Sequence, residues 1–261
     1  MDRYNGRRAL VTGGGSGIGQ ATVLRLLAEG GDVVAADVSE AGLKDTVAKA
    51  GAHAERLRTV VVDVADEASV RAAVASALAT LGGLDVLVNA AGILRSSHTH
   101  ETSLADFTKV IAVNLTGTFL VIREAIPALL EGTAPAVVNF SSTSAMFAHP
   151  YMAAYAASKG GIQSMTHALA AEYAGRGIRF TAVQPGSISS GMTDGSGESR
   201  QSLGPGLPED ADLRLFAKLS PALGKGFAGP ESVAGVVAML ASEDGAFITG
   251  TEIRIDGGTH F

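Results

Sequence analysis

Tyr155 and Lys159 stand four residues apart in the run Tyr-Ala-Ala-Ser-Lys. On a helix, residues i and i+4 share one face, so the ammonium lies beside the phenol. A neighbouring cation favours the ionised phenol and lowers its pKa from about 10 toward neutral pH. Such a tyrosine takes a proton from an alcohol or returns one to a carbonyl. Pairs of this kind are also common on exposed helix faces, so a catalytic interpretation needs further residues.

A glycine-rich loop near the start of the chain provides a second signal. Residues 12–19 read Thr-Gly-Gly-Gly-Ser-Gly-Ile-Gly between an apolar run and a helical run. A pyrophosphate needs a tight turn, a close approach of the backbone and exposed N–H groups at a helix N-terminus. A bare glycine loop is only a flexible turn, but a position between the first strand and the first helix predicts a dinucleotide site.

Asp37 closes the second predicted strand, beyond that loop. A carboxylate there accepts hydrogen bonds from a ribose diol and repels a 2′-phosphate. Val38 follows, and the glycine loop contains no Arg or Lys to pair with a phosphate. We therefore expect NAD to be preferred over NADP. The alternative is that Asp37 caps the next helix, although Ser39 is equally available as a cap.

The elements that must position these residues alternate along the chain. Short β-branched runs are separated by Ala- and Leu-rich segments, a pattern that predicts βαβ units, an α/β fold and a parallel sheet covered on both faces. The predicted strands are Ala9–Thr12, Asp32–Ala36, Thr59–Val62, Val86–Asn89, Ala136–Phe140, Arg179–Val183 and Glu252–Ile255. The predicted helices are Gly17–Glu29, Ser39–Ala50, Glu67–Leu81, Ser103–Leu130, Met152–Gly175 and Pro230–Ser242.

One long segment interrupts this alternation. Residues 187–227 are rich in Gly, Ser and Pro and only weakly helical near Asp210–Leu219. They follow the sixth strand, at the carboxyl edge where open α/β sheets bind ligands. We predict that they form a substrate lid, the alternative being a spacer. No repeat or second domain is evident, so residues 1–261 are expected to form one domain.

Composition limits the classes of function. The chain has 261 residues, 46% hydrophobic and 18% charged, with a net charge of -6 and no cysteine. This excludes thiol chemistry and argues against a nucleic-acid or anionic-membrane binder. The start of the chain has no apolar h-region, and the apolar stretch Val110–Leu130 is interrupted by Asn114, Arg123 and Glu124. We expect a soluble cytoplasmic protein in which that stretch is a buried or interface helix.

Several separated motifs together resemble the short-chain dehydrogenase/reductase family over nearly the whole chain. Residues 12–19 match its TGxxxGxG loop, Asp63-Val64 its adenine-facing pair, and Asn89-Ala90-Ala91-Gly92 its NNAG motif with Ala90 replacing the second Asn. Pro185-Gly186 matches the turn that borders the nicotinamide, and Ile188 the position whose amide meets the carboxamide. Ser189 replaces a frequent threonine. Asn114, Ser142, Tyr155 and Lys159 match the catalytic tetrad.

The resemblance implies a Rossmann-type, doubly wound, seven-stranded parallel sheet in the order 3-2-1-4-5-6-7. It implies binding of NAD by the residues just named, including Gly13, Ser16, Gly17, Ile18 and Gly19 of the loop, and Asp37, Tyr155 and Lys159. It also implies hydride transfer between nicotinamide and a secondary alcohol or ketone, with Tyr155 as acid and base. Lys159 would hold the nicotinamide ribose, Ser142 the substrate oxygen and Asn114 a relay water. Ser142 also lies in a polar run in which any hydroxyl could cap a helix.

Family members are usually homotetramers or homodimers, and the two long apolar helices 103–130 and 152–175 agree with this. The expected substrate residues are Leu94, Ser144, Met146, His149, Tyr151 and Met192. They include no arginine clamp, so we expect a neutral or modestly polar alcohol or ketone. A 3-oxoacyl-thioester reductase and, from another class, a non-catalytic dinucleotide sensor remain alternatives. His98 and His100 lie in a loop without further ligands, so no metal site is predicted.

Overall fold

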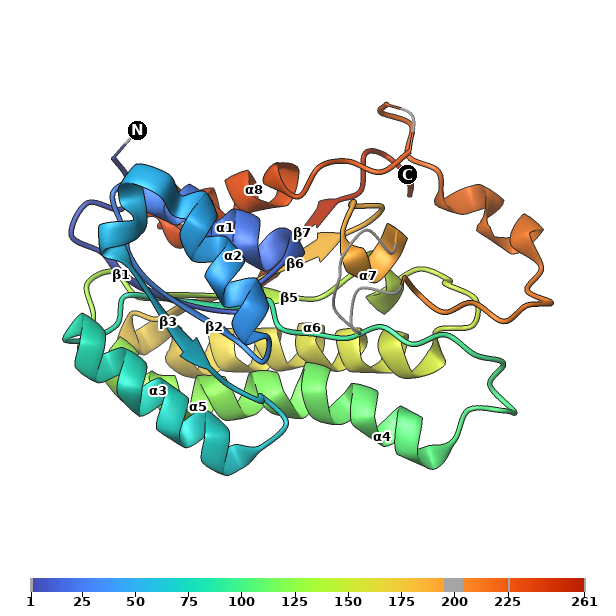
Figure 1. The fold of residues 1–261 in the computed structure, drawn as a ribbon, viewed down its shortest axis with the longest axis horizontal. Helices are drawn as coiled ribbons and strands as arrows, with labels where there is room; N and C mark the ends of the chain where they lie inside the picture. Colours follow the sequence, from blue (N-terminus) through green and yellow to red (C-terminus); the bar gives the residue numbers. More distant parts are fainter. Residues whose placement is uncertain (1, 195–203, 225, 261) are drawn as a thin grey trace.

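The computed structural model describes residues 2–194, 204–224 and 226–260 (Figure 1). Its centre is a seven-stranded sheet in the order β3-β2-β1-β4-β5-β6-β7, and every neighbouring pair is parallel. The strands are β1 Arg8–Thr12, β2 Asp32–Asp37, β3 Leu57–Val61, β4 Val86–Asn89, β5 Ala136–Phe140, β6 Arg179–Pro185 and β7 Thr251–Ile255. This confirms the predicted doubly wound α/β fold and strand order.

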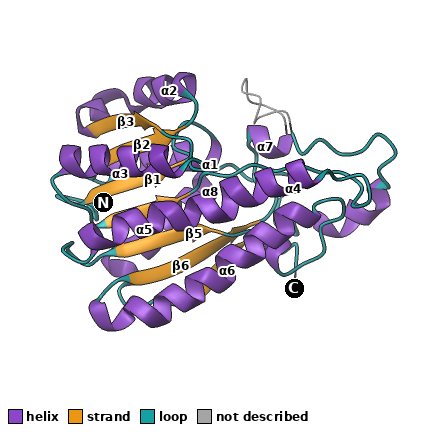
Figure 2. Cartoon of the chain, turned by 90° about the horizontal axis from the view of Figure 1, so that it is seen from below, coloured by secondary structure: helices purple, strands orange, loops and turns teal. Residues whose placement is uncertain are grey.

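Helices cover both faces of the sheet. In Figure 1, α1 (Gly17–Ala28), α2 (Glu40–Ala50) and α8 (Glu231–Ala241) lie above it. Below it lie α3 (Glu67–Leu81), α4 (Leu104–Ile111), α5 (Gly117–Leu129) and α6 (Ala153–Tyr173). Figure 2 shows the same three layers from below. Parallel strands joined by helical crossovers place every carboxyl end at one edge, so the loops that follow the strands converge there.

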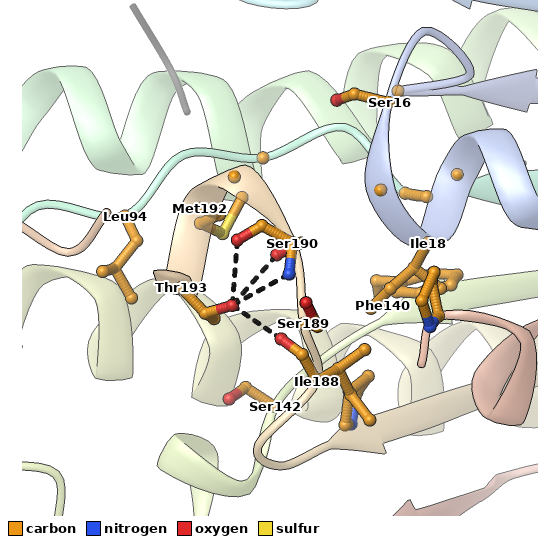
Figure 3. Close-up of a pocket in the computed structure, with 18 of the residues that line it drawn as sticks. Ser16, Ile18, Leu94, Phe140, Ser142, Ile188, Ser189, Ser190, Met192 and Thr193 are labelled. Atoms are coloured by element: carbon orange, nitrogen blue, oxygen red, sulfur yellow. Dashed lines mark hydrogen bonds between the residues drawn. The ribbon is translucent and has the colours of Figure 1, made fainter. Parts of the chain in front are cut away.

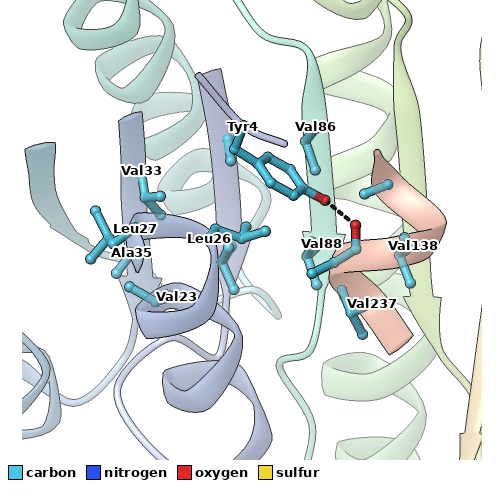
Figure 4. Close-up of a cluster of buried hydrophobic side chains, with 14 of the residues drawn as sticks. Tyr4, Val23, Leu26, Leu27, Val33, Ala35, Val86, Val88, Val138 and Val237 are labelled. Atoms are coloured by element: carbon cyan, nitrogen blue, oxygen red, sulfur yellow. Dashed lines mark hydrogen bonds between the residues drawn. The ribbon is translucent and has the colours of Figure 1, made fainter. Parts of the chain in front are cut away.

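The central strands are apolar without alternation because both of their faces are covered. All residues of β4 and β5 are buried. One buried cluster lies between the sheet and α1 and α8; it includes Tyr4, whose hydroxyl donates to the Ala238 carbonyl of α8 at 2.7 Å (Figure 4). A second cluster lies between the sheet and α3, α5 and α6. The site is therefore built on rigid strands.

The predicted helix Ser103–Leu130 is not uniform. It consists of α4, a wider π-helical turn at Ala112–Thr116, and α5. Periodicity predicts helix here but cannot show the extra residue that such a turn contains. By length and hydropathy, the stretch Leu104–Leu129 could cross a membrane, yet it packs against α3 and α6 within the fold. Core helices pass the same test, which agrees with the predicted buried or interface helix.

The segment after β6 is only partly described. Its first residues form the short helix α7 (Gly191–Asp194), which the sequence did not predict. A 3₁₀ helix at Leu213–Leu219 confirms the weakly helical stretch predicted near residues 210–219. Residues 195–203 and 225 of the predicted lid lie outside the described part. The described parts border the cleft at the carboxyl edge.

Candidate active site

A cleft of roughly 1870 Å³ opens at the carboxyl edge of the sheet. Its walls come mainly from the loops after β1 to β6 and from the end of the chain. The predicted cofactor residues line it with one exception, namely Gly13, Ser16, Gly17, Ile18, Gly19, Asp37, Asp63, Val64, Ala90, Ala91, Gly92, Tyr155, Lys159, Pro185, Gly186 and Ile188. The sequence motifs therefore converge on one cavity although they are far apart in the chain.

Asn89 is the exception. It ends β4 with its side chain buried at 2% exposure, and its Nδ2 donates to Asn139 Oδ1 at 2.9 Å. Asn139 in turn donates to Thr166 on α6 at 3.0 Å. The side chain of Asn89 thus links β4 to β5 beneath the cleft instead of facing it. The motif matched at Asn89, but a strand residue alternates between two faces and only its neighbours 90–92 reach the cavity.

The glycine loop has the geometry that a diphosphate requires. Gly13 has a φ of +70°, and a Cβ on it would lie 2.7 Å from Ala91 N. A Cβ on Gly19 would lie 2.0 Å from Gly13 O. Both positions therefore exclude any side chain, one through its conformation and one through close approach of the backbone. A merely flexible turn would not require these close contacts.

Side chains beneath the loop hold it in place. Thr46 on α2 donates to the Gly14 carbonyl at 2.8 Å and accepts from Gln20 Nε2 at 2.8 Å. A Cβ on Gly42 would lie 2.7 Å from Gly15 O, so α2 packs directly on the loop. The loop is held in one conformation by α1 and α2 together, which reduces the entropy lost when a ligand is ordered there.

The first turn of α1 faces the cleft. Its N-cap, Ser16, makes no side-chain capping bond and has an extended backbone. The first N–H groups of a helix carry the positive end of its dipole and bind anions. Figure 3 shows Ser16 and Ile18 on one side of the cavity, opposite Ser190, Met192 and Thr193. An anion between these walls would meet backbone donors.

Asp37 closes the far side of the loop. Its Oδ2 accepts from Gly15 N at 2.9 Å and its Oδ1 from Ser39 N at 2.9 Å. Ser39, and not Asp37, caps α2 by accepting from Gly42 N at 3.1 Å. Ser39 therefore fills the capping role that was the alternative interpretation of Asp37. Val38 beside it is 51% exposed and supplies no cation.

Ser142 lies at the end of β5 and is 8% exposed. It caps the short 3₁₀ turn Thr143–Ala145, since its Oγ accepts from Ser144 N at 3.2 Å. This is the helix-capping role that the sequence offered to any hydroxyl of residues 141–144, and Ser142 can fill it and a catalytic role together. Because the hydroxyl oxygen accepts from the backbone, its hydrogen remains available to donate into the cleft.

Tyr155 and Lys159 lie on α6, with Lys159 Nζ 5.6 Å from the centroid of the Tyr155 ring. The ammonium donates to the Phe140 carbonyl at 2.7 Å. Burial raises the pKa of Tyr155 to about 12, although the Ser142 hydroxyl lowers it. Burial also lowers the pKa of Lys159 to about 8. The expected depression of the phenol pKa is therefore absent here, because burial of the phenol outweighs the hydrogen bond from Ser142.

Asn114 lies within the π turn and is fully buried. Its Oδ1 accepts from Ile93 N at 2.8 Å, while its Nδ2 donates to Ile93 O at 2.9 Å and to Ser158 Oγ at 3.0 Å. Asn114 does not line the cleft. It instead fixes the loop after β4 against α6. Gly92 lies beside both Asn114 and Lys159: a Cβ on it would be 3.3 Å from Asn114 Oδ1 and 3.6 Å from Lys159 Nζ.

The predicted substrate residues divide into two groups. Leu94, His149 and Met192 line the cleft, whereas Ser144, Met146 and Tyr151 do not. Ser144 is buried and Met146 is 58% exposed outside the cavity. The Tyr151 hydroxyl accepts from Asp212 N at 2.9 Å, so this side chain contacts the segment after β6 instead of the cleft.

Other residues at the cleft were not predicted. Thr143 and Met152 flank predicted positions, and Thr259 and His260 come from the end of the chain after β7. The topology offered a signal for His260, because it follows the carboxyl end of a parallel strand. Arg95 and Lys109 also line the cleft, and neither forms an ion pair within residues 2–194, 204–224 and 226–260. The list of expected substrate residues contained no arginine, and these two cations are additions to it.

The predicted absence of a metal site rested on His98 and His100. His98 Nε2 lies 2.8 Å from Asp210 Oδ1, across to the segment after β6, and the two imidazoles are 5.6 Å apart. Among the residues that the structure describes, no group of three or more potential ligands is assembled. His98 therefore contributes a polar contact between two loops.

Comparison with known proteins identifies the family. The model of the short chain dehydrogenase family matches residues 7–201, more than half of the chain. This chain is a short-chain dehydrogenase. It is 37% identical to 2-(S)-hydroxypropyl-CoM dehydrogenase 3 of Xanthobacter autotrophicus over 95% of this chain and 94% of that protein. It is 36% identical to D-threitol dehydrogenase of Mycolicibacterium smegmatis over 98% and 94% of the two chains.

A solved relative supports the same assignment. It is the crystal structure of 3-ketoacyl-(acyl-carrier-protein) reductase from Brucella melitensis complexed with NADH. The two structures superpose with a TM-score of 0.84 at 28% sequence identity, and the match covers 98% of this chain and 99% of that chain. Members of this family interconvert alcohols and carbonyls with a nicotinamide dinucleotide. The present short-chain dehydrogenase is accordingly an oxidoreductase acting on CH–OH groups.

Proposed function

We propose that this dehydrogenase interconverts a secondary alcohol and a ketone with NAD(H), using Tyr155 as its general acid and base. The observation that carries the proposal is the convergence of Tyr155, Lys159 and Ser142 on the same cleft as the glycine loop. A nicotinamide dinucleotide supplies the hydride donor or acceptor when bound. The glycine contacts and the open first turn of α1 fit such a ligand.

The preference for NAD is part of the proposal. Asp37 is fixed at the end of β2 by Gly15 N and Ser39 N, with exposed Val38 beside it. A carboxylate at this place favours an unmodified ribose and repels a 2′-phosphate. The NADH complex of the related ketoacyl reductase agrees with a family site of this kind.

Each side chain has a distinct task in the proposal. Tyr155 donates or removes the proton of the substrate oxygen, and Ser142 donates a hydrogen bond to that oxygen as charge develops on it. Lys159 stabilises the ionised phenol and binds the ribose. Asn114 accepts a hydrogen bond from a water molecule that also contacts Lys159. Two features support this role: Asn114 Oδ1 has a second lone pair besides the one that accepts from Ile93 N, and Gly92 has no side chain to fill the space beside Lys159 Nζ.

We further propose that residues 187–227 are the substrate lid of a single domain spanning residues 1–261. The described part of this segment lines the cleft with Met192, Leu207, Phe216 and Leu219. Exposed apolar side chains on α4 and α5, such as Phe107 and Phe119, support a homotetramer or homodimer. A cytoplasmic location is consistent with a chain that carries no cysteine.

Reduction of a 3-oxoacyl thioester is a second candidate. Arg95 and Lys109 line the cleft without an acidic partner in the described structure, and phosphates of a thioester carrier would find cations there. The ketoacyl reductase from Brucella melitensis favours the same alternative. Acetoacetyl-CoA therefore belongs among the substrates tested.

The experiment is a spectrophotometric assay at 340 nm with secondary alcohols, ketones and acetoacetyl-CoA, each with NAD(H) and NADP(H). We expect turnover with NAD(H), and Tyr155→Phe should lower kcat by about 10²–10⁴-fold because the ring stays while the proton carrier is lost. Tyr173→Phe, at the other end of α6, is the matched control. Dinucleotide binding without turnover of any substrate would instead support a sensor.

A further inference from the structure

His149 has one fixed tautomer. It lies between the 3₁₀ turn Thr143–Ala145 and α6 and lines the cleft. Its Nδ1 is 3.2 Å from the Phe147 carbonyl oxygen. A carbonyl can only accept, so Nδ1 must carry the hydrogen in this contact. The other ring nitrogen, Nε2, is then left with an unprotonated lone pair.

That nitrogen faces Thr143, which also lines the cleft. Nε2 lies 3.4 Å from the hydroxyl oxygen of Thr143, the residue next to Ser142. The Thr143 hydroxyl also lies 3.5 Å from the Pro185 carbonyl. Both distances exceed those of well-formed hydrogen bonds, so Nε2 has only a weak partner in the protein. A ligand hydroxyl at this point would offer a better one.

The surroundings keep the imidazole neutral. Burial lowers the pKa of His149, and the neighbouring His260 lowers it as well, while the Phe147 carbonyl acts in the opposite direction. The two imidazole centroids are 6.0 Å apart. His260 is itself stacked on the Phe147 ring at 3.9 Å with an interplanar angle of 3°. A neutral ring with the hydrogen on Nδ1 accepts through Nε2 and cannot donate there.

We propose that His149 Nε2 accepts a hydrogen bond from a second hydroxyl of the substrate, so that the preferred substrate is a diol, a polyol or a hydroxyketone. This inference rests on the proposed function, since Tyr155 and Ser142 must hold the reacting oxygen. The neighbouring hydroxyl of the substrate then lies on the Thr143 side of the cavity. An ether or a second ketone at that place carries no hydrogen to donate and is disfavoured.

The size of the effect follows from a single neutral hydrogen bond. Loss of one such bond lowers affinity by about tenfold at most, and an acceptor left unpaired in a closed cavity adds to this. A diol should therefore exceed its deoxy analogue in kcat/KM by about tenfold or more. The difference should disappear when the acceptor is removed.

The test compares 2,3-butanediol, as its separate stereoisomers, with 2-butanol. Wild-type enzyme should favour one diol stereoisomer over 2-butanol by about tenfold or more in kcat/KM. His149→Leu should remove this preference by lowering kcat/KM for the diol about tenfold more than for 2-butanol. A thermal unfolding midpoint equal to that of the wild type would show that the variant is folded. His149→Gln presents an amide oxygen and should retain part of the preference. Met146→Leu, exposed in the same loop and away from the cleft, should behave as wild type.

The outcomes separate this inference from the proposed function. If wild-type enzyme oxidises 2-butanol with a kcat/KM equal to that for every diol stereoisomer, the role of His149 is refuted while the oxidoreductase proposal stands. If His149→Leu lowers kcat/KM equally for both alcohols, His149 shapes the site without reading a hydroxyl, and the inference is also refuted. If no alcohol or ketone is turned over, the proposed function fails and the inference falls with it.

Discussion

The phenol of Tyr155 and the amine of Lys159 are buried near one another, so their protons are best considered together. The pKa values of about 12 and about 8 mean that the pair releases its first proton near pH 8. Once one proton is gone, the pair can exist as phenol and neutral amine or as phenolate and ammonium, two forms with the same total charge. Alcohol oxidation requires the second form.

This coupling predicts opposite pH profiles for the two directions. With alcohol as substrate, kcat/KM should rise about tenfold per pH unit below pH 8 and level off above it, because the pair must have lost one proton. With ketone, kcat/KM should be highest at low pH and fall above pH 8, because Lys159 must remain an ammonium to stabilise the phenolate that forms when Tyr155 gives up its proton. Initial rates between pH 6 and 10 check this. A profile for oxidation that is flat between pH 6 and 9 would contradict it.

The proposed preference for NAD depends on the carboxylate of Asp37. Asp37→Ala combined with Val38→Arg removes the repulsion of a 2′-phosphate and adds a cation beside it. We expect the ratio of kcat/KM for NAD over NADP to fall by at least about tenfold, the loss of one charge-assisted hydrogen bond. Asp63→Ala, on the neighbouring loop, is the control. Equal use of both cofactors by the wild-type enzyme would disprove the role of Asp37.

The positions of the candidate catalytic residues were predictable because their motifs carry fixed spacings, and each of Tyr155, Lys159 and Ser142 lines the cleft. Their pKa values were not predictable, since these depend on desolvation by residues distant in sequence. Tyr151 and Ser144 were expected at the substrate site, but neither lines the cleft. Whether a loop residue faces a cavity depends on backbone torsions that no periodicity reports.

Tyr151 connects three loops. It has a φ of +66°, a strained conformation for a residue with a side chain, and its carbonyl accepts from Ser97 N at 2.9 Å. Its hydroxyl accepts from Asp212 N at 2.9 Å, and its ring lies 6.1 Å from that of Phe216. Strain of this kind persists where the surroundings hold it. Tyr151 therefore attaches the segment after β6 to the loop that leads into α6.

Tyr151→Phe should loosen that attachment without unfolding the protein. The ring contact with Phe216 stays while one hydrogen bond of about 1 kcal/mol is lost. Cleavage by trypsin at the exposed Arg214 should become about fivefold faster, a population effect of this energy. Mass spectrometry of the fragments measures it. A Tyr173→Phe variant should be cleaved at the wild-type rate, and equal rates for all three proteins would refute the attachment.

The helices and strands followed from their patterns, but two elements did not. The short helix α7 forms because Thr193 Oγ1 donates to the Ile188 carbonyl at 2.6 Å and accepts from Ser190 N at 3.1 Å (Figure 3). The π turn within the long helix depends on the contacts of Asn114 with Ile93 and Ser158. The contacts of the π turn join segments far apart in the chain, so a window of sequence does not contain them. The helix α7 has only four residues, too few for a helical period to appear.

The sheet is held together at its opposite edge by Asp85. Its carboxylate, only 2% exposed, accepts from Arg8 Nε and Arg8 N at 2.9 Å and from Thr133 N at 2.7 Å. Burial by itself raises the pKa of Asp85, but these donors outweigh it and the net pKa lies below its ordinary value of 3.8. The group thus joins the starts of β1 and β4 to the turn before β5.

Asp85→Asn should destabilise the whole molecule by about 1.5–3 kcal/mol at neutral pH, since a charge-assisted bond to a buried partner is lost. A depressed pKa gives stability that is present above pH 3.8 and disappears as the pH falls through the folded-state value. The difference between wild type and variant in guanidinium unfolding should therefore shrink below pH 4. Glu67→Gln, which removes an exposed ion pair, should change little. A difference independent of pH would contradict this assignment.

The π turn at Ala112–Thr116 also constrains any redesign of the helical stretch formed by α4, this turn and α5. Regularising it by deleting one residue would restore uniform α-helical bonding and improve local propensity. Each residue of an α-helix turns the chain by 100°. The deletion would therefore rotate α4 relative to α5. Either the Asn114 side chain would turn away from Ile93, or the face of α4 that carries Phe107 would turn away from its present position. A more perfect helix would be obtained at the expense of the enzyme.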